Sequence, residues 1–211
     1  MAKADPSIEP RILESARREF LAQGFEKASL KQICEQAQVT TGALYKRYAS
    51  KEELFCAVVA QTVADLEEII RQKSAVSPAD LTDHELIQAW DMDVDYMMWW
   101  FQYLYDRHDG FVLLLRCAAG TRYANFTHDW VAVMTDATEA FYQEAFRRGL
   151  TRVEVPKNEL HVLLSAFWTT IYEPFIHDFS WQEIESHCLL VCRMFDWYAM
   201  FGFPKEAEAP R

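Results

Sequence analysis

The residues best suited to contact another molecule lie in one short stretch near the N-terminus. They are small, hydroxylated, aromatic or basic, namely Thr40, Thr41, Gly42, Ala43, Tyr45 and Lys46. Small side chains let a backbone approach a large partner, and hydroxyl, Tyr and Lys groups hydrogen-bond phosphate oxygens and base edges. Small methyl-bearing side chains can touch the thymine methyl group. A helix with this surface would suit the major groove of DNA.

The segment before this stretch has the pattern of a supporting helix and a tight turn. Ser29 can cap that helix, because its hydroxyl can accept a hydrogen bond from a free N–H of the first turn. Apolar residues recur at helical spacing along it: Leu30, Ile33, Cys34 and Ala37. Gln38 and Val39 form the turn, and Thr40 caps the second helix. Residues 29–54 therefore predict a helix, a turn, a second helix and the start of a third.

Residues 29–54 resemble the TetR/AcrR family of bacterial transcriptional regulators. The matching positions are Ser29, Ile33-Cys34, Ala37-Gln38-Val39-Thr40, Gly42-Ala43-Leu44-Tyr45, Tyr48 and Ser50-Lys51-Glu52-Glu53-Leu54. Two residues depart from the family pattern, Cys34 at a small Ala and Gln38 at the turn Gly. Gln38 carries a modest steric cost, because Gly is favoured in such turns. The alternative interpretation is an accidental helical hairpin with a basic surface.

The resemblance implies an all-α fold with two functional parts. We expect an N-terminal three-helix helix-turn-helix DNA-binding domain over residues 1–55 and a helical effector-binding and dimerisation bundle over 56–204, followed by a flexible tail over 205–211. Thr40 to Lys46 would read the major groove. Phosphate groups would be contacted by Ser29, Lys31, Tyr48 and Lys51.

Composition is consistent with a globular chain of 211 residues and a net charge of −11. Residues 1–60 contain nine basic residues (Lys and Arg) and eight acidic residues (Asp and Glu), so they are nearly neutral. The remainder contains twelve basic and twenty-four acidic residues, so it carries nearly all of the negative charge. DNA contact would therefore be confined to the first part.

The chain has no apolar run of membrane-spanning length and no signal-peptide core at its start. Its five scattered cysteines fit reduced thiols, so we expect a cytoplasmic protein.

A second candidate site is the aromatic-rich region of the later chain. Residues 51–73 predict a long connecting helix, 74–83 a linker, and 85–108 one further helix. Large side chains on this helix and its expected neighbours predict a pocket for a hydrophobic ligand. The candidate lining residues are Trp90, Asp93, Met97, Trp100, Phe101, Leu104, Leu114, Cys117, Trp130, Met134, Phe167, Trp168 and Ile171. The alternative is that these residues form an ordinary packed core.

Asp93 falls within the apolar side of the helix expected over residues 85–108. A buried carboxylate is costly without a partner, so Asp93 would pair with an Arg or a Tyr hydroxyl, and Arg116 is one candidate. The functional alternative is that Asp93 binds a cationic amphipathic ligand together with the surrounding ring faces.

The remaining chain predicts three helices, over residues 123–148, 159–177 and 180–201. The last one carries two apolar stripes, and only one of them can face its own core. A homodimer through the last two helices of each chain would cover the other.

The sequence contains no recognisable set of catalytic residues. There is no Gly-rich phosphate loop, nucleophile elbow or CxxC pair, and the six histidines are dispersed. Glu173 and His177 could share a metal, but a local hydrogen bond explains their spacing better. We therefore expect no cofactor, no metal and no catalytic residue. The expected function is a ligand-responsive, DNA-binding regulator, most simply a repressor of a palindromic operator. The alternative is a helical dimer that acts as a non-DNA interaction module or as a small enzyme.

Overall fold

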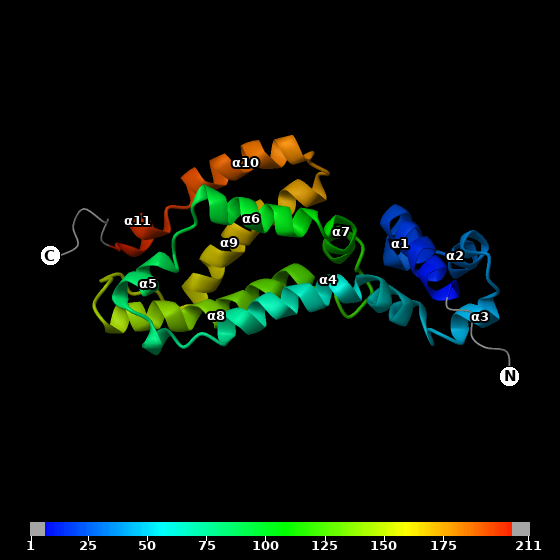
Figure 1. The fold of residues 1–211 in the computed structure, drawn as a ribbon, viewed down its shortest axis with the longest axis horizontal. Coiled ribbons are helices and arrows are strands. Elements are labelled where there is room, and N and C mark those ends of the chain that lie inside the picture. The colour runs from blue at the N-terminus through cyan, green and yellow to red at the C-terminus, as the bar shows by residue number, and fades with distance from the viewer. Residues whose placement is uncertain (1–6, 204–211) are drawn as a thin grey trace. The chain divides into compact units, whose positions relative to one another are not determined.

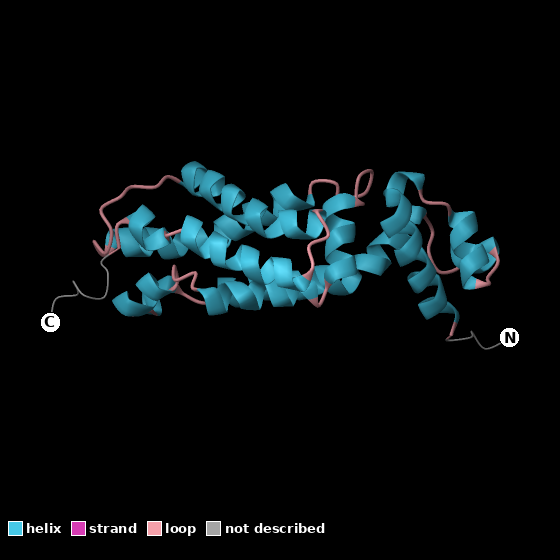
Figure 2. Ribbon diagram, turned by 90° about the horizontal axis from the view of Figure 1, so that it is seen from above, coloured by secondary structure: helices cyan, strands magenta, loops and turns pink. Residues whose placement is uncertain are grey.

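The computed structural model describes residues 7–203, and every regular element in that range is a helix (Figures 1 and 2). The all-α prediction is confirmed. The chain divides into two compact units. Within the described residues, the first combines 7–66 with Arg107–Phe126, and the second combines Glu67–Asp106 with 127–203. The predicted flexible tail over 205–211 lies outside the described residues.

The first unit holds the N-terminal helices and one helix from the middle of the chain. Its elements are α1 (Ile8–Lys27), α2 (Leu30–Ala37), α3 (Thr41–Tyr45), most of α4 (Lys51–Ser74) and α7 (His108–Arg116). Its core includes Ile12, Ala16 and Phe20 of α1, which are fully buried. Gly24 has a φ of 72° and interrupts the helical backbone of α1, which resumes beyond it and continues to Lys27.

Helix α7 is joined to α1 and α4 by polar contacts and by close packing. Arg17 on α1 donates to Asp109 over 2.7 Å, and Arg107 donates to Asp65 on α4 over 2.6 Å. Gly110 lies against Thr62 so closely that a Cβ at Gly110 would be 2.0 Å from the Thr62 hydroxyl oxygen. Only glycine fits this contact without movement of α4 or α7.

The second unit holds the remaining helices. They are η1 (Pro78–Asp80), α5 (Asp83–Gln88), α6 (Val94–Tyr105), α8 (Phe126–Arg147), α9 (Lys157–Ile176), α10 (Trp181–Met194) and α11 (Trp197–Phe201). Helix α10 packs along α6 in Figure 1. Its buried side consists of Ile184, Cys188 and Val191.

Two predicted helices are each broken in the structure. The helix expected over 85–108 is divided, since α5 ends at Gln88 and α6 begins at Val94, where Asp93 caps it by accepting a hydrogen bond from the Tyr96 N–H. Helix α6 ends at Tyr105, and α7 begins at His108. The helix expected over 180–201 ends at Met194, and Asp196 caps α11. Asp competes with the helical backbone for hydrogen bonds, so an apolar stripe can continue across an Asp while the helix itself stops.

The core of the second unit is predominantly aromatic. The Trp90 ring contacts Phe201, with the ring centres 4.7 Å apart, and it also contacts Tyr142 and Trp197. The Trp168 ring lies edge-on to Trp100 and to Trp130. These rings come from α6, α8, α9, α11 and the segment between α5 and α6, so ring packing holds the bundle together.

Candidate functional site

The first candidate site is formed by α2, the turn after it and α3. Ser29 caps α2 by accepting from the Gln32 N–H, and Thr40 caps α3 by accepting from the Ala43 N–H. Gln38 occupies the turn with φ 54° and ψ 47°, the left-handed conformation that glycine would adopt most easily. Its N–H donates to the carbonyls of Cys34 and Glu35 and so closes α2. The predicted helix–turn–helix is present.

Residues of α1 fix the position of α2 through buried polar contacts. The Ser15 hydroxyl donates to the Ile33 carbonyl over 2.9 Å, and the Glu19 carboxylate accepts from the Ser29 N–H over 2.9 Å. Both side chains are 5% exposed. The sequence did not reveal these two positioning residues, because each contacts a partner ten or more residues away and neither interrupts the helical pattern.

Helix α3 presents one side to solvent and buries the other. Leu44 is fully buried, whereas Tyr45 is 53% exposed. Thr41, Gly42 and Lys46 are exposed beside Tyr45. A Cβ at Gly42 would meet nothing closer than the Thr40 hydroxyl oxygen, 3.9 Å away. The space where a side chain would lie at Gly42 is therefore open to a partner molecule.

The residues predicted to contact phosphates have different surroundings. Lys31 is exposed, with its ammonium 3.8 Å from Glu35, and Ser29 retains a hydroxyl proton to donate. Lys51 instead donates to the carbonyls of Glu26 and Ala28 near the end of α1.

Tyr48 does not have the exposure that a phosphate contact needs. It is 7% exposed, and its hydroxyl donates to the Glu9 carboxylate over 3.2 Å. Burial, together with the Glu9 charge, raises the pKa of Tyr48 to about 12. We therefore assign Tyr48 to the core between α1 and α3 and Lys51 to the end of α1, and we propose phosphate contact for neither.

The second candidate site is a cavity inside the second unit. Its volume is about 30 Å³, roughly that of one water molecule. The lining residues come from α4, α6, α8, α9, α11 and the segment between α5 and α6. They are Lys73, Ala89, Trp90, Met92, Tyr96, Trp100, Met134, Thr138, Leu164, Phe167, Trp168 and Trp197.

The sequence predicted the lining of this cavity in part. Five predicted residues line it: Trp90, Trp100, Met134, Phe167 and Trp168. Met97, Phe101, Leu104, Trp130 and Ile171 are buried in the same unit without lining it, and Leu114 and Cys117 belong to the first unit. Lys73, Tyr96 and Trp197 were not predicted, because residues on separate helices share a cavity only through the tertiary fold.

The prediction that Asp93 lies buried among aromatic rings is wrong. Asp93 is exposed, and its carboxylate accepts from the Tyr96 N–H over 2.8 Å at the start of α6. It is absent from the cavity lining. The charged residue that does line the cavity is Lys73, a cation near the end of α4.

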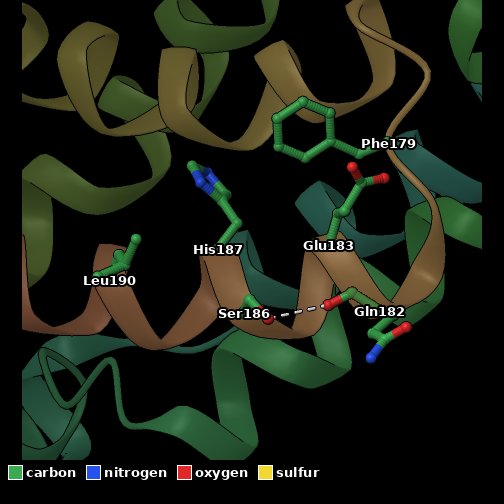
Figure 3. A pocket seen from close by; sticks show the side chains of 6 residues that line it. All are labelled: Phe179, Gln182, Glu183, Ser186, His187 and Leu190. Carbon is green, nitrogen blue, oxygen red and sulfur yellow. Dashed lines mark hydrogen bonds between the residues drawn. The ribbon is translucent and has the colours of Figure 1, made fainter.

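An exposed apolar face occupies the outer side of α10. Leu189, Leu190 and Met194 are 48%, 61% and 62% exposed. Beside Leu190 lies an open depression of about 400 Å³, whose wall includes His187 and Phe179 (Figure 3). His187 contacts α9 through the Thr170 carbonyl, 2.7 Å from its Nε2. On α9, Val162 is 59% exposed.

Metal ligands do not gather anywhere in the described part of the chain. Glu173 and His177 lie 3.0 Å apart as a local pair on one helix. Residues 7–203 contain no cluster of three or more potential metal ligands. No helix in this range is both long and apolar enough to cross a membrane.

Comparison with known proteins places these sites in context. The profile described as "Bacterial regulatory proteins, tetR family" matches residues 12–58. The chain is 26% identical over 170 residues to the HTH-type transcriptional repressor AcnR of Corynebacterium diphtheriae, covering 78% of this chain and 77% of that protein. It is 43% identical over 51 residues to the HTH-type transcriptional regulator UidR of Escherichia coli K12, covering 24% and 26% of the two chains.

A solved structure extends the likeness to nearly the whole fold. The SmeT–triclosan complex superposes with a TM-score of 0.62 at 19% identity, covering 98% of this chain and 96% of that chain. At this identity the likeness concerns the fold alone. The N-terminal unit and the helical second unit thus both have counterparts in known structures.

Proposed function

This chain belongs to the TetR family of bacterial transcriptional regulators, and from that premise we propose that it represses a palindromic operator as a homodimer that a hydrophobic small molecule releases. Regulators of this family bind DNA through their helix-turn-helix and are not enzymes. The observation that carries the proposal is the exposed, open side of α3 over Gly42, Tyr45 and Lys46.

In this proposal α3 enters the major groove, and the first turn of α2 approaches the sugar–phosphate backbone of the DNA. Tyr45 and Lys46 reach base edges or phosphate oxygens, while Gly42 permits close approach. Ser29 and Lys31 contact phosphates. Two copies of α3 related by a two-fold axis would read the two halves of an inverted repeat.

Exposed apolar residues on α10 and on α9 support the dimer. Leu190 and Met194 on α10 and Val162 on α9 are each more than half exposed, and the depression beside Leu190 can accept a side chain of a second copy. A two-fold interface places the same patch on both subunits, so the face would be covered by itself.

The connection between α6 and α7 offers a route from effector to DNA. Helix α6 lines the cavity with Tyr96 and Trp100, and the chain then passes into α7, which contacts α1 through Arg17 and Asp109. A ligand that favours one arrangement of α6 would shift the conformational equilibrium of α7 and, through α7, that of the DNA-binding helices. A relative named as a repressor supports repression, and a structural neighbour solved with triclosan supports a small-molecule effector.

The boundary between the two functional domains is also part of the proposal. We place the DNA-binding domain at residues 1–55 and the effector-binding and dimerisation domain at 56–204. The compact units differ from this division because α7, from the middle of the chain, packs with α1 and α4.

The test of the DNA-binding proposal is selection of bound sequences from random DNA by the purified protein at near-physiological salt. We expect an inverted repeat to be enriched. Tyr45→Ala and Lys46→Ala should each weaken binding to that repeat about tenfold or more, since a hydrogen bond to a base or phosphate is worth roughly 1–3 kcal/mol.

The matched control for these variants is Arg71→Ala, which removes an exposed cation of α4 paired with Glu68. It should leave operator affinity unchanged. Unaltered affinity in both α3 variants would contradict the assignment of α3 as the recognition helix.

The dimer proposal predicts that Leu190→Glu produces a folded monomer. A charge in each copy of a self-complementary apolar patch would face its symmetry mate at a high desolvation cost. Sedimentation velocity should show half the mass, and affinity for the inverted repeat should fall. Val76→Glu, at an exposed apolar residue outside α9 and α10, is the control and should remain dimeric. A dimeric Leu190→Glu variant would place the interface elsewhere.

A further inference from the structure

The residues that line the effector cavity carry one kind of charge. Lys73 is the charged side chain among them, and no Asp or Glu lines the cavity. Within residues 7–203, the Lys73 ammonium has no anionic partner, and it lies over the Phe141 ring, 5.1 Å from the ring centre. Burial lowers the pKa of this ammonium, since a cation in an apolar setting loses hydration. The cavity therefore holds a cation whose charge is not neutralised by the protein.

Three of the residues that line the same cavity carry buried hydrogen-bond donors that lack acceptors among the described residues. The indole N–H groups of Trp90, Trp168 and Trp197 are buried and have no acceptor among the described residues. Each of these side chains is 2% exposed, and all three line the cavity. A buried donor without an acceptor costs about 1–3 kcal/mol, so three around one small space require an explanation.

A single trapped water molecule does not account for these groups. The cavity volume of about 30 Å³ would hold one water. A water oxygen accepts two hydrogen bonds, whereas the three indoles and the ammonium offer at least four donors. A carboxylate has two oxygens and about four acceptor positions, together with the negative charge that Lys73 lacks.

The remainder of the lining suits an apolar body. Phe167, Leu164 and the ring faces surround the space, and Met92 and Met134 border it. Methionine side chains are unbranched and adaptable, so they can move to enlarge this small cavity.

We infer that the effector is a small apolar monocarboxylate, and that Lys73 and the indole N–H groups of Trp90, Trp168 and Trp197 bind its carboxylate. This inference rests on the proposed function, because it names the ligand class of the same cavity. It replaces the cationic ligand that was predicted when Asp93 was expected among the aromatic rings.

The experiment measures binding of two matched probe series to the purified full-length protein by isothermal titration calorimetry. One series is octanoate, methyl octanoate and octylamine, and the other is phenylacetate, methyl phenylacetate and 2-phenylethylamine. Within each series the apolar body is nearly constant while the head group is anionic, neutral or cationic. We expect at least one carboxylate to bind about tenfold more tightly than its ester and its amine.

The variant that tests the cation is Lys73→Met, which keeps an unbranched side chain one heavy atom shorter and removes the charge. It should weaken carboxylate binding about tenfold and leave ester binding unchanged. Lys73→Arg should retain part of the preference. Lys157→Met is the control, because Lys157 is a cation of the same unit paired with Asp136 and Glu139 outside the cavity lining.

Operator binding by the same proteins separates this inference from the proposed function. Equal affinity for ester, amine and carboxylate, no binding of any probe, or a carboxylate preference that survives Lys73→Met would each overturn the inference, even if an inverted repeat is bound. Carboxylate binding that depends on Lys73 supports it. If such binding is found in a protein that selects no DNA sequence, the ligand class stands and the regulatory proposal falls.

Discussion

Replacement of Gly42 by leucine is expected to lower operator affinity by about 100-fold or more while the protein stays folded. The physical reason is the open space above this residue. Apart from its chain neighbours and the backbone of its own helix, a Cβ at Gly42 would meet no atom closer than 3.9 Å, so the leucine side chain would project from the exposed side of α3. In the groove it would hold the helix away from the bases, and each hydrogen-bonded base that the helix can no longer reach costs roughly 1–3 kcal/mol.

The measurement combines a binding titration on the selected repeat with thermal unfolding of the free protein. Gly42→Ala is the companion variant, because it adds one methyl group that a groove can accommodate beside a thymine. It should keep most of the affinity, and its stability should be unchanged or higher, since Ala favours a helix over Gly by up to ~1 kcal/mol. A leucine variant that binds the operator normally would show that this side of α3 does not face DNA.

Replacement of Gly110 by alanine is expected to destabilise the protein by roughly 1–3 kcal/mol, as overpacking of a close contact does. Gly110 lies within α7, where alanine would ordinarily be the better helix former. The new Cβ, however, would be 2.0 Å from Thr62 Oγ1 and 2.9 Å from Thr62 Cβ. The two helices would have to separate, so the change in stability should have the opposite sign to that of Gly42→Ala.

A double-mutant cycle with Thr62→Ala isolates this contact. Removing the Thr62 hydroxyl relieves the shortest approach but leaves the Cβ, so it should restore part of the stability that Gly110→Ala removes. Urea denaturation of the four proteins gives the coupling free energy. Additive effects, or a Gly110→Ala variant as stable as the parent, would contradict the close packing of α7 on α4.

The contrast between Asp93 and Lys73 shows how one helix boundary changed the chemistry inferred for a site. With residues 85–108 taken as a single helix, Asp93 fell among apolar residues and suggested a cationic ligand. In the structure Asp93 caps α6 and is exposed, while Lys73 lines the cavity. The expected charge of the ligand is therefore reversed.

The sequence by itself determined the helix-turn-helix of this protein. The caps at Ser29 and Thr40 and the turn at Gln38 all follow from contacts between residues a few positions apart. Such local interactions can be predicted from the amino-acid sequence, so the two helices and their exposed residues could be predicted. The two apolar stripes expected on the last helix likewise indicated that one of its sides lacks a partner within its own unit, and the structure leaves Leu190 and Met194 exposed.

Only the tertiary structure decided which distant residues meet. The burial of Tyr48 against Glu9, the contact of Gly110 with Thr62 and the cavity shared by Lys73 and Trp197 each join residues 39 or more positions apart. Apolar periodicity gives the buried side of a helix but not the neighbour that covers it, and a charged residue near a helix end gives no sign of where its ammonium will lie. The chemistry of the cavity depends on those pairings, because a charge acts on a ligand through distance and burial rather than through position in the sequence.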